Sequence, residues 1–170
     1  IGLALGEPPT SKGYPPSSLT LLPQLMERAG KEEGKGSITA FFTVLIEGDD
    51  MQDPIADQSR SILDGHIVLS RELTDFGIYP PVHILNSASR VMSDIVSSEQ
   101  LGAILKFRRL YTLLKENEML IRIGAYQKGS DAQLDEAIAK KGDMEKFLIQ
   151  SSTAVVDFGS AKEQLIALMA

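Results

Sequence analysis

The sequence has no cysteine and only two histidines among its 170 residues. Without cysteine, disulfide bonds, thiolate metal sites and cysteine nucleophiles are excluded. Long apolar runs are missing as well: the longest, residues 38–46, is too short to span a bilayer and is interrupted by Thr39 and Thr43. The chain begins with Ile1, and no basic segment followed by a cleavage site is present. We therefore expect a cytoplasmic protein without a secretory signal.

Basic residues are outnumbered, since 17 lysines and arginines stand against 23 aspartates and glutamates, for a net charge of -6. This balance argues against a general nucleic-acid binder, which usually carries a basic face. The histidines also suggest no chemistry: His66 is expected in a buried strand, and His83 has no Ser, Asp or Cys at a catalytic spacing. The apolar content of 43% is that of a globular protein, and the length fits one domain or one and a fraction.

A phosphate-binding loop is also absent from the sequence. The nearest stretch runs from Gly30 to Ser37 (GKEEGKGS), and its two leading glycines are one residue too close together. Its lysine is Lys35, and Gly36 stands where Ser or Thr should bind magnesium. The chain therefore has no recognisable loop to hold nucleotide phosphates.

Residues 1–95 are predicted to form an α/β layer. Residues 37–46 and 66–70 are apolar almost throughout, as strands covered on both faces are. Between them Asp53 is a predicted cap for a helix beginning at Pro54, with Ile55, Ile62 and Leu63 inward. Strands that alternate with helices favour a parallel sheet. The remaining predicted elements are a Pro-, Gly- and Ser-rich loop at 6–18, a helix at 19–30, a charged turn at 31–35, a short helix at 71–76 and a break at 77–81.

Residues 96–170 are predicted to form a separate, small helical bundle. Apolar residues recur at helical intervals in 97–116, with basic residues between them. Asp131 is a predicted cap for a second helix, and Gly159-Ser160 precedes a third. The apolar positions are Ile104, Phe107, Tyr111 and Leu114 in the first helix, Leu134, Ile138, Met144, Phe147 and Leu148 in the second, and Leu165, Ile166, Leu168 and Met169 in the third; the basic ones are Lys106, Arg108 and Arg109.

Five motifs follow one another in the sequence: GEPPTSKGYPPS, ERAG, GSITAFFTVLIEGDDMQDPIAD, ILDGHIVLSREL and GIYPPVHILNSASRVM. In this order they resemble the flagellar protein-export ATPases, relatives of the rotary ATP synthase catalytic subunit and of the injectisome ATPases. The likeness extends to about Gln150. IGAYQKGSD, from Ile123, resembles flagellar members, whereas injectisome relatives more often have Glu where Ala125 stands. The acidic loop of the synthase helical domain is lacking.

The resemblance implies a fold and an activity. Residues 1–95 would be the C-terminal part of a RecA-like P-loop NTPase domain with a parallel sheet, and 96–170 the helical C-terminal domain. In the whole enzyme, ATP would be hydrolysed with Mg²⁺ between the protomers of a homohexamer. The phosphate loop, the magnesium-binding acid and the carboxylate that orients water would come from upstream sequence. This chain alone is expected not to hydrolyse ATP and to bind it weakly at best.

Arg90, in Asn86-Ser87-Ala88-Ser89-Arg90, matches the arginine finger of this family. A guanidinium with a rigid fork of donors can meet two oxygens of the γ-phosphoryl group and neutralise charge that grows in the transition state. In a hexamer Arg90 would serve the site of the neighbouring protomer. An ordinary salt bridge is the alternative role for this arginine.

Two aromatic residues match the adenine contacts of the family. Tyr79, followed by Pro80 and Pro81, corresponds to the ring that stacks on adenine, and packing at a strand entry is its alternative role. Phe147 corresponds to one wall of the adenine pocket. The second aromatic of the synthase relative is replaced by Ser151-Ser152, and this change favours Phe147 as a core residue.

An acidic cluster follows the predicted strand at 37–46 and consists of Glu47, Asp49, Asp50 and Asp53. It lacks the glycine-centred twelve-residue pattern of a calcium loop, so no metal site is expected. A solvated turn is one interpretation. The resemblance implies another: this loop, with the Pro-rich loop at 6–17, would face the hole of the hexamer and contact a coiled-coil stalk through ion pairs that salt weakens.

The resemblance also implies further partners and a place in the cell. These are a regulatory peripheral-stalk protein, export chaperones and substrates, and, indirectly, a membrane export gate at the cytoplasmic face of the inner membrane. Alternatives remain an injectisome ATPase, an ATP synthase-related subunit, and a non-enzymatic docking module that reuses the ATPase-like half.

Overall fold

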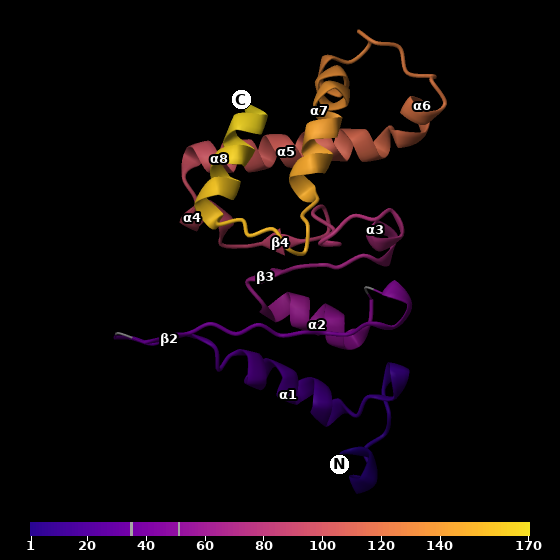
Figure 1. Cartoon of the computed structure of the whole chain (residues 1–170). Helices are drawn as coiled ribbons and strands as arrows, with labels where there is room; N and C mark the ends of the chain where they lie inside the picture. Colours follow the sequence, from indigo (N-terminus) through magenta and orange to yellow (C-terminus); the bar gives the residue numbers. More distant parts are fainter. Residues whose placement is uncertain (35, 51) are drawn as a thin grey trace. The chain divides into compact units, whose positions relative to one another are not determined.

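The computed structural model describes residues 1–34, 36–50 and 52–170, so Lys35 of the imperfect phosphate-loop motif lies outside the described residues. The chain divides into two compact units, an N-terminal unit (Ile1–His66) and a C-terminal unit (Ile67–Ala170). The division expected from the sequence lies later, near residue 95, and remains a prediction. Figure 1 labels the elements of both units.

The N-terminal unit is built around two helices, α1 (Pro16–Met26) and α2 (Pro54–Ile62), which pack against each other. The Gln58 side chain donates to the carbonyl oxygen of Leu19 at 3.0 Å, which ties α2 to α1. Ala56 and Ser59 are the buried residues of α2, whereas the predicted inward residues Ile55 and Ile62 are only half-buried. The other elements of this unit are the 3₁₀ turns η1 (Leu3–Leu5), η2 (Ser11–Gly13) and η3 (Glu47–Asp49) and the strands β1 (Gly30–Lys31), β2 (Ser37–Ile38) and β3 (Gly65–His66).

The strand predicted at 37–46 forms over two residues only. β2 pairs antiparallel with β1, with Gly30 opposite Ile38, and residues 39–46 have no regular secondary structure. Phe41 and Leu45 are each 91% exposed. A strand that is apolar on both faces needs neighbouring strands for its hydrogen bonds and covering elements for its side chains. Within the described part of the chain this segment has no paired strand beyond Ile38, and its other face, with Phe42, Val44 and Ile46, is only half-buried.

The strand predicted at 66–70 also differs in its pairing. Leu69 pairs with Val82 in an antiparallel bridge, the His83 amide donates to the Val68 carbonyl at 2.8 Å, and the Ser70 amide donates to the Pro81 carbonyl at 2.9 Å. At these positions, as at β1 and β2, antiparallel pairs stand where the alternation of strands and helices favours a parallel sheet. A parallel pair needs a long crossover, whereas the short return at 70–81 brings the chain back antiparallel.

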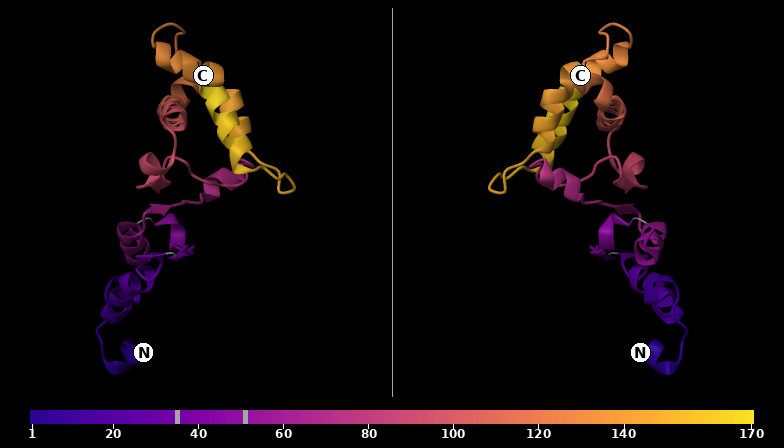
Figure 2. Two further views of the ribbon diagram at one scale, coloured as in Figure 1. Left: turned by 90° about the vertical axis from the view of Figure 1, so that its left-hand side faces the viewer. Right: turned by 90° about the vertical axis from the view of Figure 1, so that its right-hand side faces the viewer.

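The C-terminal unit is mostly helical, as the sequence predicts. Its long helix α5 (Ser98–Glu116) contacts both α7 (Ala132–Leu148) and α8 (Phe158–Met169), and α7 also contacts α8 (Figures 1 and 2). Predicted caps are present, since the Asp131 carboxylate accepts the amides of Gln133 and Leu134. The prediction that Gly159-Ser160 precedes the third helix is wrong, because α8 begins at Phe158 and includes both residues, with the Asp157 carboxylate as its cap. The remaining elements are α3 (Arg71–Asp75), β4 (Ala88–Ser89), α4 (Met92–Ile95) and α6 (Glu118–Arg122).

The buried apolar residues of α5, α7 and α8 form one cluster, and the buried Leu73 of α3 lies outside it. On α5 they recur at intervals of four, three and four residues, which places them on one face of the helix. Half-buried side chains, among them Tyr111 and Phe147, pack around them. The buried members are Ala103, Phe107, Leu110, Leu114, Leu134, Ala137, Met144 and Met169.

Candidate functional site

Arg90 stands directly after β4, at the exposed end of a hydrogen-bonded turn of residues 83–89. The carbonyl oxygen of His83 accepts the Ser87 amide at 3.0 Å and the Ser87 hydroxyl at 2.9 Å. That hydroxyl also accepts the Val68 amide at 3.0 Å. The turn is therefore bonded both internally and to the preceding extended segment, and Arg90, which follows it, is an exposed residue.

A second arginine, Arg108 of α5, binds the same turn. Its Nη1 donates to the carbonyl oxygens of Ile84 at 2.6 Å and Ser87 at 3.2 Å, and its Nη2 donates to that of Leu85 at 3.1 Å. The sequence identifies Arg108 only as one of three basic residues between apolar positions. Its acceptors are backbone atoms 21 to 24 residues away, and no side-chain pattern encodes them.

Tyr79 lies in the connection that follows α3, and this tyrosine is 53% exposed. Its carbonyl oxygen accepts the amide of Gln150, just after α7, at 2.7 Å. This bond fixes the backbone at Tyr79 to the end of the helix that carries Phe147. The exposed ring is available for stacking on a flat ligand.

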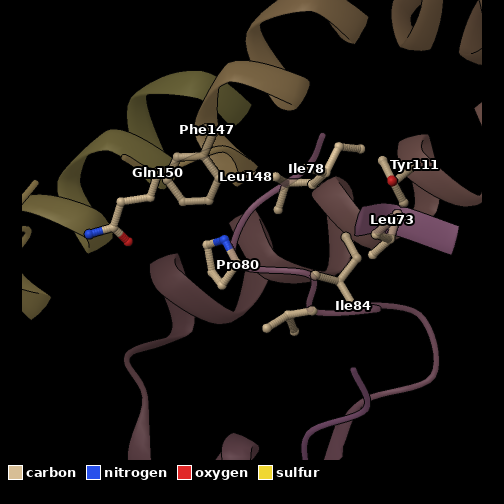
Figure 3. Close-up of a pocket in the computed structure, with 9 residues that line it drawn as sticks. Leu73, Ile78, Pro80, Ile84, Tyr111, Phe147, Leu148 and Gln150 are labelled. Atoms are coloured by element: carbon tan, nitrogen blue, oxygen red, sulfur yellow. The ribbon is translucent and has the colours of Figure 1, made fainter. Parts of the chain in front are cut away.

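Phe147 lines an apolar cavity of about 260 Å³ in the C-terminal unit (Figure 3). The two neighbours of Tyr79, Ile78 and Pro80, line the same cavity, whereas Tyr79 does not. The Phe147 ring also contacts that of Phe107, with centroids 5.7 Å apart. The structure thus brings Phe147 and the backbone around Tyr79 together, but not both rings into one cavity. The other lining residues are Leu73, Val82, Ile84, Tyr111, Leu148 and Gln150.

Tyr111 is the one residue with a hydroxyl among those that line this cavity. Burial raises the pKa of Tyr111 above its ordinary value, although the nearby Lys115 ammonium acts in the opposite direction. The Lys115 nitrogen lies 6.0 Å from the centroid of the Tyr111 ring. The hydroxyl therefore stays protonated at neutral pH and can donate a hydrogen bond.

In the N-terminal unit, two residues of the acidic cluster are paired with the Pro-rich loop. The Lys12 ammonium contacts the Asp50 carboxylate and lies 3.3 Å from that of Asp53. The hydrogen bond from Lys12 lowers the pKa of Asp50, and the same bond raises the pKa of Lys12. Burial opposes ionisation of Asp53, but the amides of Ala56 and Ile55 and the Lys12 ammonium outweigh it, so the pKa of Asp53 is lowered. The side chain of Asp49 lies outside the described structure.

The described residues offer neither a metal-binding group nor a membrane-spanning helix. In residues 1–34, 36–50 and 52–170, no group of three His, Cys, Asp or Glu side chains is placed to hold a metal ion. Over the same residues, no helix combines the length and the apolar character that crossing a membrane requires.

Residues 1–89 match the model of the ATP synthase alpha/beta family, nucleotide-binding domain. The chain belongs to the ATP synthase alpha/beta family. Residues 96–167 match a second model, the C-terminal domain of the type III secretion ATPase EscN. The two matches leave residues 90–95 between them, a stretch that begins with Arg90 and contains α4.

Curated and solved relatives agree with this assignment to the ATP synthase alpha/beta family. The chain is 74% identical over 165 residues to the "Flagellum-specific ATP synthase" of Helicobacter pylori strain J99, an alignment that covers 97% of this chain and 38% of that protein. The assembled ATPase EscN from the type III secretion system of enteropathogenic E. coli matches 99% of this chain and 41% of its own, with a TM-score of 0.95 and 46% identity. EscN in complex with its central stalk EscO gives a TM-score of 0.87 at 44% identity, over 99% of this chain and 40% of that one.

These matches confirm the resemblance and the family fold expected from the motifs. The chain spans only about two fifths of the length of the relatives that it matches. The roles of Arg90, Tyr79 and Phe147 remain predictions.

Proposed function

We propose that this chain is the C-terminal portion of an ATP-hydrolysing export ATPase of the bacterial flagellar type. The observation that carries the proposal is Arg90, exposed at the end of a turn that α5 holds, in a chain 74% identical to a flagellum-specific ATP synthase. The higher identity to this relative than to EscN, at 46%, favours a flagellar over an injectisome role.

In this proposal ATP is hydrolysed between neighbouring protomers, and Arg90 acts in trans. Its planar guanidinium would donate two hydrogen bonds to oxygens of the γ-phosphoryl group and offset the charge that develops there. Arginine fingers of this kind contribute roughly 10³ to 10⁵ in rate. Tyr79 would stack on adenine, and Phe147 would support the adenine pocket from the core side.

The residues of this chain do not fit a magnesium site, because Gly36 replaces the hydroxyl residue of a phosphate loop and the described residues offer no cluster of metal ligands. We propose that upstream sequence of the whole protein holds the phosphates and Mg²⁺. The chain alone should then show no ATP turnover above a buffer blank.

Assembly follows the solved relative in this proposal. EscN is described as assembled and as bound to its central stalk EscO. We propose a homohexamer here as well, with residues 6–17 and the acidic cluster toward a stalk protein at the cytoplasmic face of the membrane. A peripheral-stalk regulator, chaperones and export substrates would be further partners.

The test is the Arg90→Ala variant of the whole ATPase that contains this chain. We expect kcat to fall by roughly 10³ or more while nucleotide affinity changes little, because the finger acts mainly in the transition state. Arg71→Ala, which removes another exposed arginine, is the matched control and should keep wild-type turnover. Equal losses of kcat and affinity in Arg90→Ala would instead indicate a structural role.

A further inference from the structure

The contact between Arg108 and the turn of residues 83–89 is an unusual use of an arginine. One guanidinium meets three backbone carbonyl oxygens, those of Ile84, Leu85 and Ser87. Hydrogen bonds from a charged donor are shorter and roughly twice as strong as neutral ones. A planar fork that reaches three acceptors from two nitrogens also fixes the direction of the peptide groups that it contacts. Arg108 therefore determines the conformation of this turn.

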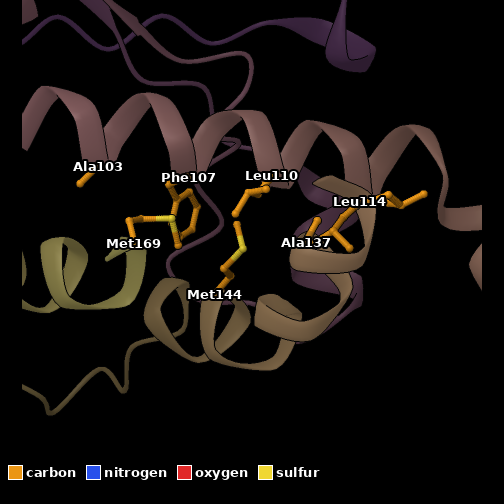
Figure 4. Packing of buried hydrophobic residues seen from close by; sticks show 8 residues of the cluster. Ala103, Phe107, Leu110, Leu114, Ala137, Met144 and Met169 are labelled. Atoms are coloured by element: carbon orange, nitrogen blue, oxygen red, sulfur yellow. The ribbon is translucent and has the colours of Figure 1, made fainter. Parts of the chain in front are cut away.

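The other end of the contact is rigid. Arg108 is flanked along α5 by Phe107 and Leu110, which are buried in the apolar cluster to 4% and 2% exposure (Figure 4). Close-packed cores allow little movement of such a helix. The turn is thus attached to a helix that is packed into the core of the C-terminal unit.

The turn leads directly to Arg90. Ser87, whose carbonyl oxygen accepts from Arg108, is three residues before Arg90. The Ser87 hydroxyl donates to the His83 carbonyl and accepts the Val68 amide, so Ser87 is fixed through its side chain as well as through its backbone. If the contacts of Arg108 are lost, Ile84, Leu85 and Ser87 lose a shared donor, and the start of β4 loses its support from α5.

We infer that Arg108 is a positioning residue for Arg90: it fixes the turn that sets where the finger guanidinium lies in the neighbouring site. This inference rests on the proposed function. Because a displacement of about 1 Å in a reacting group can lower a rate by about 10²-fold, loss of Arg108 should reduce turnover without direct contact with ATP.

The experiment is a double-mutant cycle in the whole ATPase, with Arg90→Ala, Arg108→Ala and the double variant. We expect Arg108→Ala to lower kcat about 10- to 100-fold with an unchanged KM for ATP. The double variant should be no slower than Arg90→Ala alone, because Arg108 acts only through Arg90. Arg109→Ala, the adjacent exposed arginine, should keep wild-type kcat.

The thermal midpoint of each variant separates positioning from folding. If Arg108→Ala lowers the thermal midpoint, Arg108→Lys takes the place of Arg108→Ala in the cycle. Lysine keeps the charge and three donors but not the planar fork. The kcat of Arg108→Lys should then lie between those of wild type and Arg90→Ala.

Three results would overturn the inference, and they are distinguishable. Normal kcat in Arg108→Ala, or losses that multiply in the double variant, would refute the positioning role alone. Normal kcat in Arg90→Ala would refute the proposed function, and the inference with it.

Discussion

Each of the two units of the chain is stabilised internally by a different kind of contact. In the C-terminal unit, α5, α7 and α8 enclose one cluster of buried apolar side chains, including Met144 at 0% exposure. Among the described residues of the N-terminal unit, the buried apolar ones are Met26 and Ala56. Its other fixed contacts are mainly polar: the Lys12 ion pairs, the Asp53 cap and the bond between Gln58 and Leu19.

The difference shows what each kind of element needs from its neighbours. Helices satisfy their own backbone hydrogen bonds, so three of them can close a core by packing apolar faces together. A central strand depends on its neighbours for hydrogen bonds, and residues 39–46 have no paired strand in the part of the chain that the structure describes. The chain spans 38% of its flagellar relative, and the C-terminal unit is the part with a core of its own.

The largest expected effect would test this contrast directly. Leu110→Ala should destabilise the C-terminal unit by about 2–5 kcal/mol, because it opens a cavity in the packed cluster. Phe41→Ala removes a larger but exposed side chain and should change stability by about 0.5 kcal/mol or less. Urea unfolding of the chain, followed by circular dichroism at the helix band, measures both. Similar losses for the two variants would contradict the contrast.

The same contrast explains which parts of the fold could be predicted from the sequence. The helix predicted at 97–116 occurs as α5 at Ser98–Glu116, and the Asp53 and Asp131 caps are confirmed, because periodicity and caps are local signals. The strand at 37–46 could not be established locally, since its pairing depends on other segments. On α5 the predicted apolar position Ile104 is only half-buried, whereas Leu110, which is not among the predicted positions, is buried. Spacing alone indicates an apolar stripe on the helix but can place it one position away from the face that is buried.

The candidate site was predictable only in part. Motif likeness singled out Arg90, Tyr79 and Phe147, and the placement of Phe147 against Phe107 agrees with the core role that the missing second aromatic favours. Arg108 was not identifiable, because its acceptors are carbonyl groups, which every residue carries. Residue type therefore indicates the side chains that could contact a ligand. It does not indicate that the Arg108 guanidinium binds the backbone of the turn before Arg90.

A smaller effect is expected at the helix caps, and it would sharpen the comparison. Asp131→Ala removes the acceptor for the Gln133 and Leu134 amides at the start of α7, so we expect a loss of about 1 kcal/mol in the urea transition. Asp143→Ala removes an exposed carboxylate of the same helix that pairs only with Lys146, and should cost about 0.5 kcal/mol or less. Equal effects of the two variants would show that charge, not capping, matters at this helix.

The smallest expected effect concerns the ion pairs of the N-terminal unit. The pKa of Asp53 is lowered, so the folded state favours the carboxylate, and the stability that it contributes is present above the ordinary pKa and is lost as the pH falls through the folded value. The amides of Ile55 and Ala56, which donate to Asp53, report this titration by NMR. We expect a midpoint below 3.8, the ordinary value.

Lys12→Met removes one of the groups that favour the Asp53 carboxylate, so the midpoint should rise toward the ordinary value. Burial, which raises the pKa, and the two backbone donors, which lower it, both remain in this variant. Lys31→Met, which removes an exposed lysine of the same unit, should leave the midpoint unchanged, since a screened charge elsewhere on the surface has little influence. If both variants shift the midpoint equally, the net charge of the protein sets the pKa of Asp53, and the contact with Lys12 of the Pro-rich loop does not. The ion pair between Lys12 and Asp53 would then not count among the specific contacts that stabilise the N-terminal unit.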